Sequence, residues 1–174
     1  MSSENPPHRL NPRIHLERAQ GFFELEMFNE AEVELRAVPE NMPWLKPKRA
    51  LLIFLYQEKK EWKLMKEQAK GLRIDFPEEE DWWVSEAYAT RRADSVEEAR
   101  EVLLEGLTLN FESAIIRYNL ACYACILGSP GECMDFLKEA VRRDQKFKTL
   151  ALEDEDLKPV RPGLVKLGWG KIDK

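Results

Sequence analysis

Apolar residues recur along most of this chain three or four positions apart, which is the spacing of one face of an α-helix. The first such stripe comprises Ile14, Leu16, Ala19, Phe22 and Phe23. Further stripes follow it to about residue 145, and turns rich in proline, glycine or charged residues separate them. The pattern therefore predicts an all-helical chain in which consecutive helices form pairs.

Several turns carry residues that favour the start of a helix. Ser95 and Glu98 have the spacing of a capping box, in which the serine hydroxyl accepts a hydrogen bond from a backbone N–H. Ser129 is expected to cap in the same way, with Pro130 as the first helical residue and Glu132 in the third position. Proline is tolerated there because the N–H that it lacks would have no partner in the helix.

The paired pattern repeats with a fixed period. Ala31, Met65, Ala99 and Cys133 occupy equivalent positions in the second helix of successive pairs, and each lies 34 residues after the last. Units of this length bury their apolar faces against their neighbours in a continuous stack. We expect units at residues 12–45, 46–79, 80–113 and 114–145, then a capping segment at 146–161. Residues 1–11 are expected to be a disordered leader, and residues 162–174 a tail.

The chain resembles the tetratricopeptide repeat family across residues 12–145. The family pattern combines W-x2-L-G-x2-Y, A-x3-F and a late proline within one unit. The matching residues are Phe22, Phe28, Ala31, Leu35 and Pro43 in the first unit, Leu52, Tyr56 and Pro77 in the second, Trp83 and Ala99 in the third, and Leu120 and Gly128 in the fourth. The resemblance implies an all-α fold, a right-handed αα superhelix of four helical hairpins with a C-terminal capping helix.

The resemblance also implies a concave groove, lined by the first helix of each unit, that binds protein segments. It places Gln20, Phe23, Phe54, Gln57, Tyr88, Arg91, Arg92 and Tyr118 in that groove. Aromatic side chains beside arginine are common hot-spot residues, and they suit an apolar or amphipathic segment with an acidic flank. The expected function is a non-catalytic interaction module or adaptor that binds a peptide or a helical segment. Two alternatives are that these aromatics pack between neighbouring helices, or that the chain's own tail fills the groove through Trp169.

A second functional interpretation is a small chaperone for one client protein. The chain is short and acidic, and in this it resembles the small tetratricopeptide chaperones of bacterial secretion systems. Such a chaperone would form a dimer through residues 1–20, whereas a simple adaptor could be a monomer. The oligomeric state stays open at this point.

The composition argues against other classes of partner. The chain has 27 Lys and Arg against 32 Asp and Glu, a formal net charge of −5, and no long basic run. Nucleic acid and anionic membranes are therefore not expected as partners. No apolar run approaches the roughly 18 residues that a membrane-spanning helix needs. The polar, proline-rich N-terminus lacks the pattern of an export signal, so a cytoplasmic protein is expected.

The cysteines are the most reactive candidates in the sequence. Cys122-x-x-Cys125, with Cys133 nearby, has a spacing found in metal and redox sites. A structural zinc site needs four ligands, however, and a redox thiol needs a local environment that lowers its pKa. The only histidines, His8 and His15, belong to the opposite end of the array. We therefore expect the cysteines to act as small apolar residues in a tight helix interface within a reducing compartment.

Other signatures of catalysis are missing from the sequence. It has no phosphate-binding glycine loop, no G-x-S-x-G and no H-E-x-x-H. The acidic runs at residues 78–81 and 153–156 lack the alternating ligands and turning glycine of a calcium loop. They are expected to complement a helix dipole or to be solvated. We expect no enzymatic activity, no cofactor and no bound metal.

Overall fold

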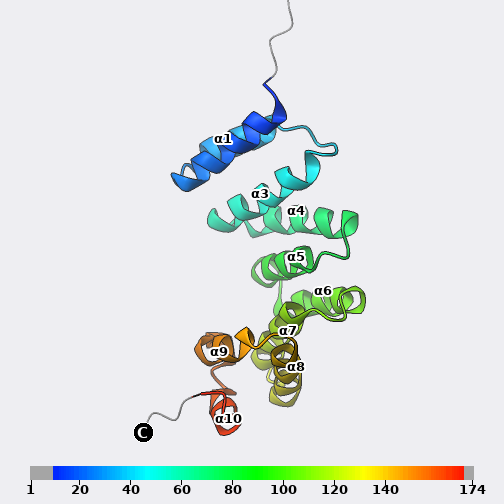
Figure 1. Cartoon of the computed structure of the whole chain (residues 1–174), viewed down its shortest axis with the longest axis vertical. Coiled ribbons are helices and arrows are strands. Elements are labelled where there is room, and N and C mark those ends of the chain that lie inside the picture. The colour runs from blue at the N-terminus through cyan, green and yellow to red at the C-terminus, as the bar shows by residue number, and fades with distance from the viewer. Residues whose placement is uncertain (1–9, 171–174) are drawn as a thin grey trace, which may run out of the picture. The chain divides into compact units, whose positions relative to one another are not determined.

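The computed structural model describes residues 10–170, and all regular structure within them is helical (Figure 1). In chain order the helices are α1 (Pro12–Glu24), α2 (Phe28–Ala37), α3 (Leu45–Glu58), α4 (Trp62–Asp75), α5 (Glu80–Ala93), α6 (Val96–Leu109), α7 (Ala114–Ile126), α8 (Pro130–Arg143), α9 (Lys146–Glu153), the 3₁₀ turn η1 (Glu155–Leu157) and α10 (Arg161–Lys166). Most of the leader predicted at residues 1–11, and the end of the tail predicted at residues 162–174, lie outside the described residues.

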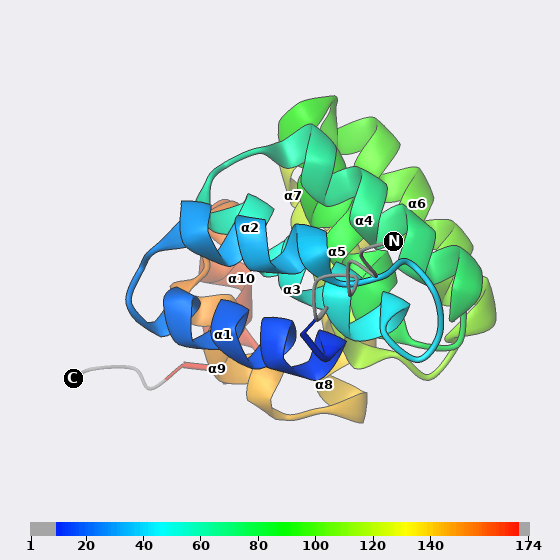
Figure 2. The ribbon, with the colours of Figure 1, turned by 90° about the horizontal axis from the view of Figure 1, so that it is seen from above.

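The chain forms two compact units, and the boundary between them falls within α4, after Gln68. In the first unit α1 packs against α2, and both helices contact α3. Figure 2 shows α1 and α2 side by side. In the second unit α5 packs against α6 and α7 against α8, and α9 and η1 add to the α7–α8 pair. Helices that follow one another in the sequence thus form pairs, as the apolar pattern predicts.

The helices keep the period of the sequence. The second helices of the pairs begin at Phe28, Trp62, Val96 and Pro130, each 34 residues after the last. The residue at the fourth position of each is almost completely inaccessible to solvent; these residues are Ala31, Met65, Ala99 and Cys133. Small or flexible side chains at these positions let two helices approach closely and still fill the interface. The predicted all-α repeat fold is confirmed.

Three of the turns inside the pairs have the same backbone conformation. Glu26 and Lys60 have φ of 57° and Gly128 has φ of 77°, so all three are left-handed. In each turn the next residue donates its N–H to a carbonyl near the end of the first helix: Met27 to Phe22, Glu61 to Tyr56 and Ser129 to Ala124. This is the pattern of a Schellman motif, which satisfies carbonyls that the helix leaves free.

The two predicted serine caps have different outcomes. The Glu98 N–H donates to Ser95 Oγ at 3.1 Å, so the first cap is confirmed. The second prediction is wrong, because the Ser129 side chain accepts no cap hydrogen bond. Ser95 has the extended backbone of a capping residue (φ −151°, ψ 164°), whereas Ser129 (φ −108°, ψ 70°) is held within the Schellman turn. The hydroxyl of Ser129 therefore does not reach the N–H groups of α8.

The second unit has one continuous apolar core, and the C-terminal segments complete it. Its largest fully buried side chain is Trp83 of α5, and Leu120 of α7 and Leu137 of α8 are also fully buried. Phe147 of α9 and Leu164 of α10 bury themselves in the same core. The apolar residues after Asp144 are thus covered by the repeats that precede them, and in turn cover the last hairpin.

Gly106 of α6 is the point of closest approach in that core. A Cβ atom at this position would lie 2.8 Å from two ring atoms of Trp83. The indole cannot easily move aside, because its Nε1 donates to the Pro77 carbonyl at 2.8 Å and the Arg73 guanidinium lies 4.5 Å from its ring. A side chain at residue 106 is therefore excluded by contact with a fixed ring.

Replacing Gly106 with alanine is expected to destabilise the chain by about 1–3 kcal/mol, because the added methyl group overpacks the core. Gly131 in α8 provides the control, since a Cβ there would meet nothing within 4 Å. Gly131→Ala is expected to leave the stability unchanged or to raise it by up to about 1 kcal/mol. Urea denaturation followed by circular dichroism measures both. Equal stability of the two variants would contradict the packing described here.

Candidate functional site

A pocket of about 760 Å³ opens on the surface of the first unit. The C-terminal part of α1, the turn after it, the first residue of α2 and the second half of α3 form its walls. Its lining residues are Gln20, Phe23, Glu24, Glu26, Phe28, Leu51, Phe54 and Glu58. It therefore brings together Gln20, Phe23 and Phe54, three of the residues that the sequence resemblance assigns to the groove. Gln57, also assigned there, is half-buried on α3 and does not line the pocket.

Three phenylalanines give this pocket an apolar surface. The rings of Phe23 and Phe28 meet edge to face, with centroids 5.9 Å apart. Each is half-buried, so the pair presents part of its surface to solvent. Phe54 is 60% exposed, although its neighbour Leu55 is completely buried. What distinguishes Phe54 from other exposed apolar residues is that it lines a pocket together with Phe23 and Phe28.

The rim of the pocket is acidic. Glu24 lies in the last turn of α1, Glu26 in the turn and Glu58 at the end of α3, and all three are exposed. None of them forms an ion pair with any other described residue, whereas many carboxylates of this chain do, such as Glu17 with Arg13 at 2.7 Å. The lining contains no Lys, Arg or His. The pocket therefore combines an apolar surface with an uncompensated negative charge.

The local backbone explains how these carboxylates come together. Leu25 and Glu26 donate to the carbonyls of Phe22 and Phe23 at 3.2 and 3.0 Å, which closes the end of α1. The left-handed conformation of Glu26 then reverses the chain, so that Phe28 at the start of α2 can meet Phe23. The turn that forms the hairpin therefore also positions one edge of the pocket.

The second unit holds the other four residues that the resemblance assigns to the groove: Tyr88, Arg91, Arg92 and Tyr118. The Arg92 guanidinium lies 3.4 Å from the centroid of the Tyr88 ring and donates to the Tyr88 carbonyl at 3.1 Å. Cation–π contact of this kind stabilises an exposed arginine on its own helix. Tyr88 and Arg92 therefore form one compact group on α5.

Arg91 and Tyr118 are engaged by the C-terminal cap. Both carboxylate oxygens of Asp156 accept from the Arg91 guanidinium, one of them at 2.9 Å, and this interaction raises the pKa of Arg91. Tyr118 donates its hydroxyl to Asp154 at 2.8 Å and stacks on Phe147 at 4.7 Å. The aspartates lie at and next to η1, in the acidic run expected to complement a helix dipole or to be solvated. Solvation, one of the two expectations for this run, describes only Glu153 and Glu155, because Asp154 and Asp156 are half-buried. Asp154 instead caps the start of η1, where its side chain accepts from the Asp156 N–H.

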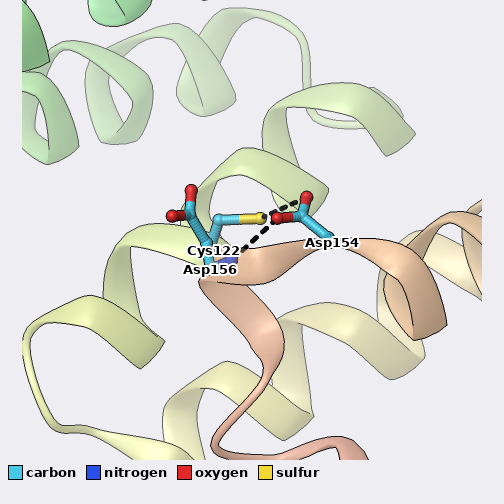
Figure 3. A group of neighbouring side chains, drawn as sticks. All are labelled: Cys122, Asp154 and Asp156. Carbon is cyan, nitrogen blue, oxygen red and sulfur yellow. Dashed lines mark hydrogen bonds between the residues drawn. The ribbon is translucent and has the colours of Figure 1, made fainter.

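Cys122 also contacts the aspartates that hold Arg91 and Tyr118 (Figure 3). Its sulfur points toward Asp154 Oδ2 at 3.7 Å, and Cys122, Asp154 and Asp156 offer ligand atoms within 4.8 Å of one another. Desolvation, followed by the nearby Asp154 charge, raises the pKa of the Cys122 thiol far above its usual range. The thiol therefore keeps its proton, and the carboxylate of Asp156 is neutralised by Arg91. These contacts describe a hydrogen-bonded closure of the cap, in which Cys122 donates to Asp154 and Arg91 pairs with Asp156.

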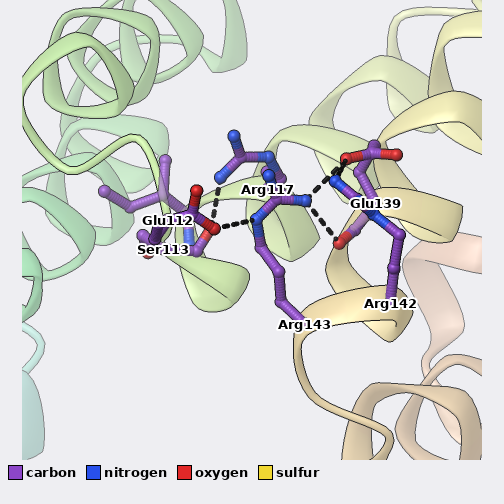
Figure 4. A network of polar contacts seen from close by, with 7 residues as sticks. Glu112, Ser113, Arg117, Glu139, Arg142 and Arg143 are labelled. Atoms are coloured by element: carbon purple, nitrogen blue, oxygen red, sulfur yellow. Dashed lines mark hydrogen bonds and ion pairs between the residues drawn. The ribbon is translucent and has the colours of Figure 1, made fainter.

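A second polar network ties the start of α7 to α8 (Figure 4). Arg143 donates to Glu112 at 3.1 Å and to Glu139 Oε2 at 2.6 Å, and Arg142 donates to the same Glu139 oxygen at 2.9 Å. These hydrogen bonds lower the pKa of Glu139. Arg117 donates to the Ser113 carbonyl at 2.9 Å, and burial, with the repulsion of Arg143, lowers its pKa. The carboxylates of Glu112 and Glu139 are thus each paired with an arginine, unlike those in the pocket of the first unit.

No protein-family profile matches this chain, and no curated protein is similar to it in sequence. Its structure, however, is similar to solved ones. TTC0263, a thermophilic TPR protein of Thermus thermophilus, matches with a TM-score of 0.65 and 16% identity over 91% of this chain and 86% of that one. MamA from Desulfovibrio magneticus RS-1 matches with a TM-score of 0.67 and 11% identity over 78% and 77% of the two chains. A further MamA structure matches with a TM-score of 0.69 and 15% identity over 89% and 86%.

The chain has the tetratricopeptide repeat fold. At these identities the likeness concerns the fold, and the chemistry of the candidate site rests on this chain's own residues. Trp169 is half-buried against the core of the second unit and is not among the residues that line the pocket of the first. Within residues 10–170, each helix is too short or too polar to cross a lipid bilayer.

The sequence interpretation missed the acidic partners of Arg91 and Tyr118. An available signal was the run at residues 153–156, which combines four carboxylates with the flanking apolar residues Leu152 and Leu157. Leu157 is completely buried, so it draws the adjacent aspartates into the interface. A charged run anchored by a buried leucine cannot be wholly solvated.

Removing the contact between Arg91 and Asp156 is expected to weaken the cap. Both side chains are 27% exposed, and a double-mutant cycle with Arg91→Gln and Asp156→Asn should give a coupling free energy of about 0.5–3 kcal/mol. The more exposed pair Arg142 and Glu139 provides the control and should give a smaller coupling free energy. Urea denaturation of the four chains in each cycle measures the two values. A coupling no larger than that of the control would contradict the closure described here.

Alkaline pH is expected to destabilise the second unit. Burial raises the pKa of Cys133 to about 12 and that of Tyr123 to about 12. Above the ordinary pKa of these groups, about 8.5 for a thiol and 10 for a phenol, the unfolded chain loses protons that the folded chain retains. The Cys133 contribution is thus complete below pH ~8.5 and that of Tyr123 below pH ~10, and each then falls by about 1.4 kcal/mol per pH unit until pH ~12. Urea midpoints at pH 8 and pH 10.5 test this, and Cys133→Ala should reduce the difference between them.

Proposed function

We propose that this chain is a non-catalytic protein-interaction module, which binds a peptide or a helical segment of another protein on the face formed by its first helices. The observation that supports this proposal most strongly is the exposure of the Phe54 side chain in the pocket of the first unit. Gln20 and Phe23 line the same pocket, and Gln57 follows on the same helix as Phe54. Exposed aromatic residues beside polar side chains are typical of binding surfaces.

The first unit is the stronger candidate for the main binding site. In the second unit, the chain's own aspartates already hold Arg91 and Tyr118. A partner there would have to replace contacts that are anchored by the buried Leu157 and Leu164. Tyr88 and Arg92 contact each other on α5, and we propose them as secondary contacts for a bound protein.

A binding role agrees with the chemistry of the reactive side chains. Burial raises the pKa values of Cys122, Cys125 and Cys133, so their thiols are poor nucleophiles near neutral pH. His15 hydrogen-bonds to Glu34 at 2.5 Å within the first unit, and the cysteines belong to the second. We therefore propose no catalytic, cofactor or metal role for the described residues. Free thiols in a buried interface also suit a reducing compartment such as the cytoplasm.

Phe54→Ala is expected to abolish or greatly reduce partner binding, because it removes the largest exposed apolar surface of the pocket. Phe111, which is 65% exposed in the second unit and does not line this pocket, provides a matched control. The wild type, Phe54→Ala and Phe111→Ala chains would each be used as bait in a lysate of the source organism. Bound proteins would be quantified by mass spectrometry.

The expected result is a set of proteins retained by the wild type and by Phe111→Ala but lost from Phe54→Ala. Circular dichroism of the three chains shows whether all are folded. Identical sets of proteins on the three baits would refute the assignment of the binding site to this pocket.

A further inference from the structure

We infer that the occupant of the pocket in the first unit is a cationic, amphipathic protein segment, with at least one Lys or Arg next to a large apolar side chain. This inference rests on the proposed function and adds the chemistry of the partner to it. It differs from the acidic flank that Arg91 and Arg92 suggest in the sequence.

The first argument is charge. Glu24, Glu26 and Glu58 line the pocket, and each is exposed and without an ion-pair partner among the described residues. Three like charges around one concave surface repel one another and raise the local concentration of cations. A Lys or Arg placed between them would form charge-assisted hydrogen bonds. An acidic segment would instead add to the repulsion.

The second argument is the apolar surface between these charges. Phe23 and Phe28 offer ring edges and faces, and Phe54 presents most of its ring to solvent. The long side chains of Lys and Arg place methylene groups on such rings while their charged ends reach the surrounding carboxylates. A guanidinium or ammonium group over a phenylalanine ring is also attracted by the ring itself. The same pocket can therefore bind the apolar and the charged parts of one segment.

The third argument is size. The pocket is an open depression of about 760 Å³, which is larger than a single side chain requires. Its walls come from α1, α2 and α3, which contact one another within the first unit. The site can thus accommodate neighbouring residues of a segment, one apolar and one or two cationic.

The fourth argument compares the carboxylates of the pocket with two arginines of the second unit. There the cations Arg91 and Arg143 are each held by carboxylates of the same chain, Asp156 in one case and Glu112 and Glu139 in the other. The carboxylates of the pocket in the first unit have no such partners among the described residues. A bound molecule would therefore supply the positive charge that these carboxylates lack. Such electrostatic complementarity directs association and selects partners.

The test is a selection of 12-residue peptides from a random display library on the purified chain, followed by fluorescence anisotropy with the most enriched synthetic peptide. Enriched peptides should contain more Lys and Arg than Asp and Glu, together with Phe, Trp, Leu or Ile. Glu24→Gln combined with Glu58→Gln is expected to weaken binding about tenfold in 50 mM salt, and the difference should shrink in 500 mM salt.

A second double variant controls for net charge. Glu30 and Glu67 are exposed in the first unit, lie outside the pocket and have no ion-pair partner among the described residues. Glu30→Gln combined with Glu67→Gln changes the net charge by the same amount and should change the affinity less than twofold. Phe54→Ala should weaken binding at both salt concentrations, because the contact that it removes is apolar.

The outcomes separate the two proposals. Enriched peptides that are acidic or uncharged, yet lose affinity with Phe54→Ala, would overturn the cationic partner and leave the binding pocket in place. Equal effects of the two glutamate pairs would also overturn it. A failure to enrich any peptide, or binding that Phe54→Ala does not affect, would overturn the proposed site as well.

Discussion

The structure depends on close contact between helices at small, buried positions that recur with the period of the repeat. Ala31, Ala99 and Cys133 are each completely buried at the fourth position of a second helix. Gly106 and Trp83 show how tight such contact becomes, since not even one methyl group fits between the helix backbone and the indole. Because interiors are packed at crystal-like density, the size of the buried residue at such a position sets the distance between two helices. A small residue at the same position of successive repeats therefore gives pairs with similar helix separation.

The last hairpin also has to be covered, and this requirement determines the chemistry of the second unit. Phe147, Leu157 and Leu164 bury themselves against α7 and α8 and bring Asp154 and Asp156 to the surface that carries Arg91, Tyr118 and Cys122. Hydrogen bonds to charged groups are stronger than neutral ones, so they hold the segment in place beyond its apolar contact. The cysteines serve this packing as small, protonated, apolar residues.

The first unit leaves a comparable surface uncovered. Its pocket combines Phe54 with carboxylates that have no counter-charge among the described residues. The difference lies in particular residues: Arg91 of the second unit pairs with Asp156, whereas Glu24, Glu26 and Glu58 of the first unit's pocket have no ion-pair partner among the described residues. This contrast underlies the proposal that the chain's binding surface lies in the first unit.

The sequence by itself determined the number of helical pairs, their period and the fold. These follow from local rules, since the spacing of apolar residues selects the helix and the small residues at 34-residue intervals select the pairing. It also assigned Gln20, Phe23 and Phe54 to one surface, and these three residues line the same pocket. Only the tertiary structure decided which charges meet. Arg91 lies 65 residues from Asp156 in the chain, and Glu24 and Glu58 reach one pocket from different helices. No periodic pattern specifies such contacts, because they arise when segments outside the repeat fold back and when turns direct particular side chains toward one another.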